Sequence, residues 1–413
     1  MDLGIYISVP FCRSKCSYCN FASGVFSAAR MEGYVSRVTD DIHAAPAVAD
    51  QAHALLPRTV DSIYFGGGTP SLLAPAQLER ILSALRERFV VSGAAEITVE
   101  CAPGMLSPEM VEAFVRCGVN RVSLGVQSFV DAEAKSVGRL HGRADVFADI
   151  ARLRSAGIRD LNLDLIAGLP HQTASSWRES LVALVATAVP HASVYMLEVD
   201  EDSRLGRELL AGGVRYHAHH VPDNGLIADL YSEACEVLPS AGIAQYEISN
   251  FARPGSESRH NLKYWQRQPY LGFGLDAHSM LSTKPPTGLP IMPPAAGRDS
   301  AVAMRFSTTG DLDTFLVAPQ LSFEAVNPQQ ALEEEIFLGL RLNRGISRTL
   351  WQDAPEVTQE KFEDIVTDCL RDGLLSECAE KLVLTHPGRM LSNEIFVRFL
   401  GLESSIPMAP AGR

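Results

Sequence analysis

The sequence predicts an α/β fold whose core is a partial (β/α)6 barrel of the TIM type. Two observations carry this prediction. Short β-branched runs alternate with longer amphipathic segments over the first half of the chain, a pattern typical of a parallel sheet. Glycine or polar residues also follow the apolar part of one strand after another, where a parallel α/β barrel carries its chemistry.

The strands and helices are expected in strict alternation. The expected strands are 4–9, 60–66, 95–100, 120–126, 160–168 and 192–198. The expected helices between them include 75–89, 107–118 and 145–157, and the apolar stretch 181–190 reads as a buried helix. Gly118 and Gly157 stand where two of these helices should end.

The last third has a different, mainly helical character. Amphipathic helices are expected within 331–351, ending near Gly345, and within 361–377, closed by Gly373. Residues 381–400 read as a short hairpin and a final helix. This segment should form a module of its own.

Composition limits the classes of function. The chain has 413 residues and a formal net charge of −13, which argues against a nucleic-acid surface. No run approaches 18 apolar residues, so no membrane span is expected. The first residues lack the features of a signal peptide, and most cysteines are scattered. These features predict a reduced, cytoplasmic protein.

Three cysteines form the most informative motif. Cys12, Cys16 and Cys19 lie in FCRSKCSYCNF, a C-x3-C-x2-C run directly after the first expected strand. Three thiolates are one short of a closed zinc or iron–sulfur site. A [4Fe–4S] cube held by three cysteines leaves one iron free to chelate a small molecule. An incomplete zinc site or a redox group is the alternative, although no histidine follows before His43.

Other candidate site residues fall at the expected strand ends. In GGGTP the glycines Gly67 and Gly68 would let a ligand approach the backbone, and Thr69 adds a hydroxyl. Glu100 closes the third strand, and Asp164 is a carboxylate within an apolar strand, which usually has a specific partner. The other candidates are Gln127, Arg139, Tyr6 and Tyr18, for which ordinary rim or core packing is an equally good interpretation.

The cysteine motif resembles that of the radical S-adenosylmethionine (SAM) superfamily. The resemblance implies a [4Fe–4S] cluster on Cys12, Cys16 and Cys19, with SAM chelated to the open iron. It also implies the partial barrel. The residues that it places near SAM are Tyr6, Tyr18, Gly67, Gly68, Thr69, Glu100, Gln127, Arg139 and Asp164.

The ordered motifs of the first half look like the coproporphyrinogen III oxidase-like branch of that superfamily. Oxidase members carry another cysteine two positions after the third cluster cysteine, where this chain has Phe21. The segment HNLKYW (260–265) looks like a motif of the HemW family of heme chaperones. That resemblance implies heme contacts from His260, Tyr264 and Trp265. The alternative is a polar, aromatic turn that plugs the barrel.

The resemblance also implies a domain division. The expected parts are a core barrel (1–225), an α+β extension with HNLKYW (226–325), a small winged-helix-like domain (326–400) and a tail (401–413). Two features depart from the family: Ala102 replaces an asparagine after the third strand, and 282–300 form a Pro-rich insert expected to be a mobile loop.

The function expected from the resemblance is that of a heme chaperone that binds a [4Fe–4S] cluster, SAM and heme and delivers heme to acceptor proteins. The alternatives are an oxygen-independent coproporphyrinogen III oxidase of porphyrin biosynthesis, a radical SAM C-methyltransferase, or a regulatory scaffold. No catalytic residue is assigned, and enzyme activity stays open. An electron donor for the cluster is expected as a partner. A homodimer and a peripheral membrane contact stay open as well.

Overall fold

The computed structural model describes residues 1–284, 301–317 and 320–401. Most of the Pro-rich insert expected at 282–300 and of the tail expected at 401–413 therefore lies outside the described residues. Within the described part, no helix is both long and apolar enough to cross a bilayer.

All six expected strands form and pair side by side in sequence order, each parallel to the next. They are β1 (Leu3–Val9), β2 (Thr59–Gly67), β3 (Val90–Cys101), β4 (Arg121–Gln127), β5 (Asp160–Ala167) and β6 (His191–Met196). The prediction of an α/β fold with a parallel core is confirmed.

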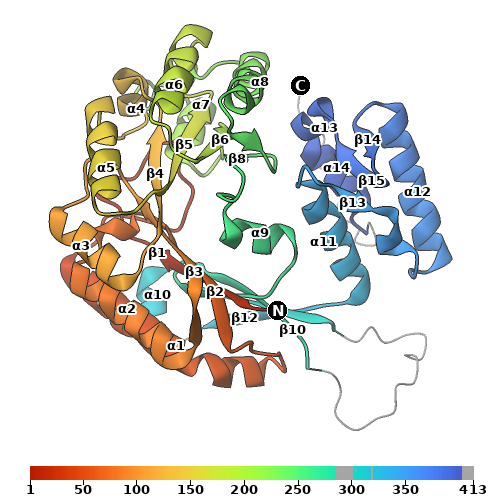
Figure 1. Cartoon of the computed structure of the whole chain (residues 1–413), viewed down its shortest axis with the longest axis horizontal. Helices are drawn as coiled ribbons and strands as arrows, with labels where there is room; N and C mark the ends of the chain where they lie inside the picture. The colour runs from red at the N-terminus through yellow and green to blue at the C-terminus, as the bar shows by residue number, and fades with distance from the viewer. Residues whose placement is uncertain (285–300, 318–319, 402–413) are drawn as a thin grey trace. The chain divides into compact units, whose positions relative to one another are not determined.

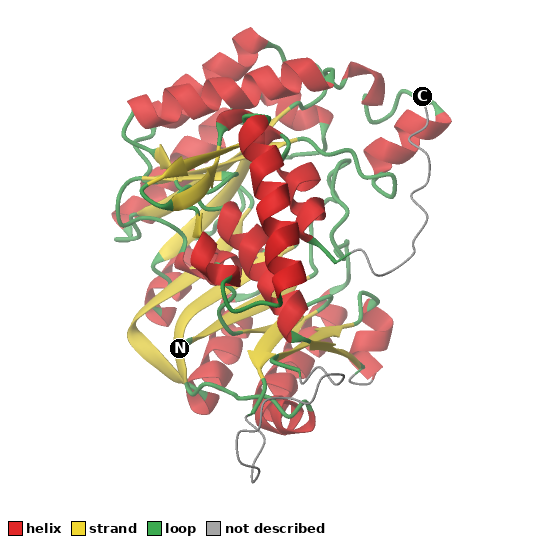
Figure 2. Cartoon of the chain, turned by 90° about the vertical axis from the view of Figure 1, so that its right-hand side faces the viewer, coloured by secondary structure: helices red, strands yellow, loops and turns green. Residues whose placement is uncertain are grey.

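Helices connect these strands along one side of the sheet (Figure 1 and Figure 2). They are α1 (Ala28–Gln51), α2 (Pro75–Arg88), α3 (Pro108–Cys117), α4 (Asp131–Ser136), α5 (Arg143–Ser155) and α6 (Ala174–Ala186). Crossovers between parallel strands are right-handed, so consecutive neighbours place their helices on the same face. The opposite face is left to line an interior.

The two faces of the sheet differ in chemistry because side chains alternate along a strand. In β1, Leu3, Ile5 and Ile7 are fully buried, whereas Tyr6 alternates with them. The register pairs Tyr6 with Tyr64 on β2. The interior positions of the sheet therefore carry polar and aromatic groups, and the apolar core lies between the sheet and its helices.

Further elements extend the sheet at both edges. Strand β9 pairs parallel with β1, and β8 pairs antiparallel with β6. Among the described residues the sheet has twelve strands in the order β12-β11-β10-β9-β1-β2-β3-β4-β5-β6-β8-β7. The strands of the extension are β7 (Ala244–Gln245), β8 (Asn250–Ala252), β9 (Tyr270–Gly274), β10 (His278–Ser282), β11 (Ala303–Thr308) and β12 (Leu321–Val326). Its helices are α7 (Arg204–Ala211), α8 (Asn224–Ser240), α9 (Arg259–Trp265) and α10 (Leu312–Val317).

The described chain divides into two compact units. The larger comprises 1–264, 268–284 and 304–324 apart from 318–319, and the smaller comprises 265–267, 301–303 and 325–401. Most of the smaller unit consists of helices around a three-stranded antiparallel sheet, β13-β15-β14. Its elements are α11 (Pro328–Leu340), β13 (Ile346–Ser347), α12 (Glu356–Arg371), β14 (Leu375–Cys378), β15 (Lys381–Leu384), α13 (His386–Met390) and α14 (Ser392–Phe399).

The predicted end of the helix near Gly345 was wrong. The helix expected to continue to about Gly345 ends at Leu340, and the next residues lead into β13. Gly345 has a φ of +63° and passes so close to β15 that a Cβ atom would lie 2.1 Å from the carbonyl oxygen of Leu382. A positive φ at this close approach requires glycine, and it turns the chain back onto the small sheet.

Candidate functional site

The carboxyl ends of β1–β6 surround a cavity of about 600 Å³. The loops after these strands supply much of its lining, as expected for a parallel α/β barrel. Eleven of the residues singled out in the sequence line it: Cys12, Cys16, Cys19, Tyr18, Gly67, Gly68, Thr69, Glu100, Gln127, Arg139 and Asp164. The structure therefore brings together groups that lie as far as 152 positions apart in the chain, from residue 12 to residue 164.

The cysteine loop after β1 lies against the glycine loop after β2. The amide of Gly68 donates to the carbonyl oxygen of Val9 (2.7 Å), and the amide of Thr69 donates to that of Phe11 (2.7 Å). A Cβ atom on Gly68 would lie 3.0 Å from the Sγ atom of Cys12. The backbone of the glycine loop thus reaches the first cysteine without an intervening side chain.

Gly68→Ala is expected to weaken SAM binding several-fold. The added methyl group would also lie 2.7 Å from the carbonyl oxygen of Phe11, so one of the two loops must move. Isothermal titration of the reconstituted protein with SAM measures the loss. Gly93→Ala is the matched control, because a Cβ atom on Gly93 would meet no atom within 4 Å beyond its chain neighbours. Equal affinities for the two variants would contradict this account of the loop.

The second cysteine faces a buried cation. The Nη1 atom of Arg139 donates to the Sγ atom of Cys16 (3.6 Å), and its Nη2 atom donates to the carbonyl oxygen of Gly125. Gln127, two residues further on, has a φ of +67° at a point where the pairing of β4 with β5 shifts register. Such strained backbone persists where the surroundings fix it, and it is frequent at functional sites.

Two carboxylates occupy the wall between the glycine loop and β6. The hydroxyl of Tyr64 donates to Oε1 of Glu100 (2.8 Å), while Ser123 and Asn162 donate to the two oxygens of Asp164 (3.0 and 2.7 Å). Burial raises the pKa of Glu100 to about 7, and the negative charge of Asp164 adds to the shift. Burial also raises the pKa of Asp164. The wall is suited to a cationic ligand, which would restore both groups to their ionised form.

SAM affinity is expected to rise about tenfold between pH 6 and pH 8. Binding of a cation by Glu100 favours the carboxylate, whose pKa in the free protein is about 7. The stability of the protein without a ligand depends on pH in the opposite direction. The pKa of Glu100 is higher in the folded protein than in the unfolded chain, so the stability that Glu100 contributes is lost as pH rises through 7. Titration calorimetry at three pH values measures the profile. Glu100→Gln should flatten it, and an unchanged slope would exclude this role for Glu100.

The residues proposed for heme lie elsewhere. His260 on α9 is 1% exposed and does not belong to the lining of the cavity. Its Nδ1 atom lies 3.0 Å from Oγ of Ser62 and its Nε2 atom lies 3.0 Å from the hydroxyl of Tyr264. Trp265 belongs to the smaller unit, where the guanidinium of Arg341 lies 4.2 Å from the centre of its ring. A heme-ligating His260 would have to leave both hydrogen-bond partners.

Tyr6 lies among these aromatic side chains rather than on the cavity surface. Its ring is stacked against Tyr64 (centroids 6.0 Å apart) and His260 (6.3 Å). Since Tyr64 carries the hydrogen bond to Glu100, Tyr6 and His260 support the cavity wall from behind.

Several lining residues were missed from the sequence: Tyr64, Thr98, Ser123, Asn162, His191 and Ser193. Each of these residues occupies one of the alternate positions of its strand that face the interior. This period-two spacing of polar residues is a signal that could have revealed them. Asn162 links three strands by donating to Ser123 (2.8 Å) and Ser193 (3.0 Å). A run of polar residues with period two inside apolar strands predicts such a lined interior.

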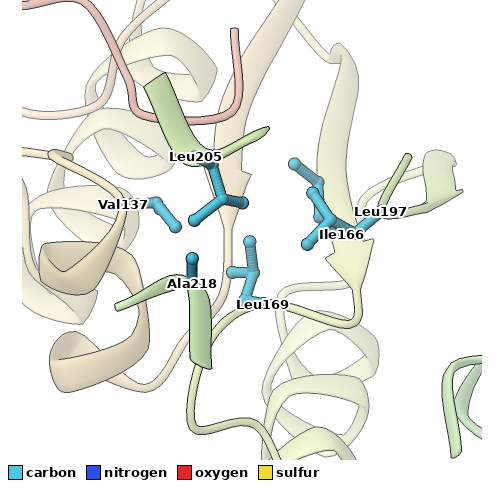
Figure 3. Packing of buried hydrophobic residues seen from close by; sticks show 6 residues of the cluster. All are labelled: Val137, Ile166, Leu169, Leu197, Leu205 and Ala218. Atoms are coloured by element: carbon cyan, nitrogen blue, oxygen red, sulfur yellow. The ribbon is translucent and has the colours of Figure 1, made fainter. Parts of the chain in front are cut away.

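An apolar cluster covers one side of the cavity. Figure 3 shows Leu205 of α7 and Ala218 facing Val137, Leu169 and Ile166, with Leu197 beside them. Tyr18 of the cysteine loop packs against this cluster. The amide of Leu205 donates to the carbonyl oxygen of Ser17 (2.8 Å), so the segment after β6 holds the cysteine loop in place.

The cavity fits an iron–sulfur cluster with SAM on two counts. Three free thiols face it from one loop, which is the donor set of a site-differentiated cube. The hydroxyl of Thr98 is buried and lines the cavity, and it has no hydrogen-bond partner in the described part of the chain, so a polar ligand would satisfy it. Within the described residues, no three His, Cys, Asp or Glu side chains are gathered closely enough to hold a single metal ion. Thiolates on separate corners of a cube need not be that close.

A curled parallel sheet with a three-cysteine loop after its first strand defines the radical SAM class, and the Radical SAM superfamily model matches residues 6–184. The model of the HemN C-terminal domain matches residues 326–391. The chain belongs to the HemW family. It is 31% identical over 398 residues to the heme chaperone HemW of Bacillus subtilis, covering 96% of this chain and 98% of that protein.

Other relatives agree. HemW of Lactococcus lactis is 30% identical over 400 residues, covering 96% of each chain. HemW of Escherichia coli is 29% identical over 400 residues, covering 96% of this chain and 98% of that one. Among solved structures, coproporphyrinogen III oxidase (HemN) of Escherichia coli has the same fold, with a TM-score of 0.77, 22% identity, and coverage of 96% and 90%.

Proposed function

We propose that the chain is a heme chaperone that holds a [4Fe–4S] cluster and SAM in this cavity, binds heme and delivers it to acceptor proteins. The observation that carries the proposal is near-full-length similarity to several chaperones of the HemW family. The cavity supports its cofactor part, because Cys12, Cys16 and Cys19 face the same space as Glu100 and Asp164.

The residues of the chain have separate tasks in this proposal. The three thiolates hold the cluster, and the glycine loop lets SAM approach the backbone beside Cys12. Glu100 and Asp164 stabilise positive charge on the ligand, and Arg139 holds the second thiolate in position. The bound cluster supplies electron-transfer chemistry, while the protein orients SAM and excludes water.

Anaerobic reconstitution followed by titration with hemin tests the proposal. The chaperone function predicts a saturable change of the heme absorption spectrum near one equivalent. It also predicts transfer of that heme to a heme-depleted hemoprotein in excess, with free hemin as the control. A titration without saturation would refute heme binding, and saturation without transfer would refute delivery.

Coproporphyrinogen III oxidase activity is the second candidate, because the fold is shared with HemN. Phe21 argues against it, since it stands where oxidase members carry a further cysteine and it lines the cavity. Incubation with coproporphyrinogen III, SAM and a reductant should therefore leave the propionate groups intact. Release of propionate carboxyl groups as carbon dioxide, which leaves two-carbon side chains on the ring, would favour the oxidase.

A further inference from the structure

One side of the cavity mouth is apolar, whereas Glu100 and Asp164 belong to a polar part of the lining. Phe21 lines the cavity, yet its side chain is 62% exposed. Met196, the last residue of β6, lines the cavity as well, and so do Leu197 and Val199 in the segment that follows it. The Nδ2 atom of Asn20 donates to Oδ2 of Asp200 (2.8 Å), which joins the stretch of Phe21 to that of Val199. We call Phe21, Met196, Leu197 and Val199 the mouth wall.

An exposed aromatic ring beside a cavity indicates a ligand. Covering such a ring stabilises a complex, whereas leaving it in water has no structural benefit. The sulfonium, amino and carboxylate groups of SAM suit the polar wall of Glu100 and Asp164, and only its adenine ring suits an apolar surface. A flat apolar ligand that stands partly outside the cavity would cover the mouth wall.

Two cations accompany the exposed ring. The Nζ atom of Lys15 donates to the carbonyl oxygen of Phe21 (3.0 Å), and Nη1 of Arg204 donates to the carbonyl oxygen of Lys15 (3.1 Å). These contacts place both cations beside the stretch of Phe21, in a chain whose formal net charge is −13. Glu198 and Asp200 line the mouth, and Asp200 is engaged by Asn20. An anionic edge of a ligand would therefore turn toward Lys15 and Arg204.

Heme has the complementary chemistry, because it combines a flat apolar macrocycle with two propionate carboxylates. We infer that heme docks on the mouth wall, with its ring against Phe21 and its propionates at Lys15 and Arg204. This inference rests on the proposed function and names the surface that would perform it. His260, in contrast, is buried and hydrogen-bonded at both ring nitrogens.

Two variants test the docking surface from different sides. Phe21→Ser removes the ring, and it leaves the backbone oxygen that Lys15 contacts. Arg204→Glu reverses a charge outside the cysteine loop, and its iron and sulfide content is measured as well because Arg204 donates to the carbonyl oxygen of Lys15 in that loop. Each is expected to weaken hemin binding at least tenfold in a spectral titration, and iron, sulfide and SAM are measured on the same samples so that a loss of heme binding can be told from a loss of the cluster.

Matched controls separate this effect from general surface changes. Val182 on α6 is also 62% exposed, and Val182→Ser should bind hemin as the wild type does. Arg88→Glu makes the same charge change on the exposed end of α2. Wild-type affinity in both Phe21→Ser and Arg204→Glu would overturn the inference while the chaperone function stands. Absence of saturable binding in the wild type would refute the chaperone function itself.

Discussion

Cys12→Ser, Cys16→Ser and Cys19→Ser are each expected to abolish the iron–sulfur cluster. The three thiols face one cavity from a single loop. Replacing one of them leaves two thiolate ligands for a cluster that already lacks a fourth protein ligand. After anaerobic reconstitution, the absorption at roughly 400 nm typical of an Fe–S centre should disappear, together with bound iron and sulfide. SAM binding should fall with it, because in the proposed function the open iron of the cluster would anchor SAM.

The fold should survive these substitutions. Backbone hydrogen bonds hold the cysteine loop to its neighbours: the amide of Thr69 donates to Phe11, the amide of Ser17 to Val137, and the amide of Leu205 to Ser17. Circular dichroism should therefore be unchanged. Cys378→Ser, at an exposed cysteine of the smaller unit, serves as the control and should keep its full iron content. A cysteine-loop variant that retained wild-type iron and sulfide would refute the assignment of the cluster.

Local patterns were sufficient to predict most of the parallel core and much of the cavity lining. The reason is that strand ends are set by short-range signals, and parallel strands in sequence order bring those ends to one edge. Glu100 was singled out because it closes a strand, and Asp164 because it is a carboxylate within an apolar strand, and both line the cavity. Once the strands are in order, the two carboxylates must share a wall.

The partners of buried groups could not be predicted in the same way. Nothing local indicates that His260 contacts Ser62, which is 198 positions away, or that Glu96 accepts from the amides of Arg259 and His260. Helical spacing does place His260 beside Tyr264, since residues four apart share a face. The sequence therefore predicted that the side chains of HNLKYW form a cluster, but it did not predict that this cluster lies behind the cavity wall.

His260→Ala is expected to destabilise the protein by about 3 kcal/mol. The substitution leaves a cavity in a tightly packed region and removes the hydrogen-bond partner of Ser62. It also removes the ring stacked on Tyr64, at a centroid distance of 5.3 Å. Urea unfolding of the cluster-free protein should show the change as a lower midpoint. His278→Ala, at an exposed histidine of β10, should leave the midpoint within about 0.5 kcal/mol of the wild type.

The same variant distinguishes the two roles considered for HNLKYW. Burial lowers the pKa of His260 to about 3, and the nearby positive charge of Lys263 adds to the shift. The ring is therefore neutral in the folded protein, and its contribution to stability is present above pH 6.5 and lost as pH falls toward 3. His260→Ala should reduce this acid sensitivity and lower stability at pH 8. If stability is unchanged while the heme spectrum shifts, His260 is a heme ligand and not a support of the cavity wall.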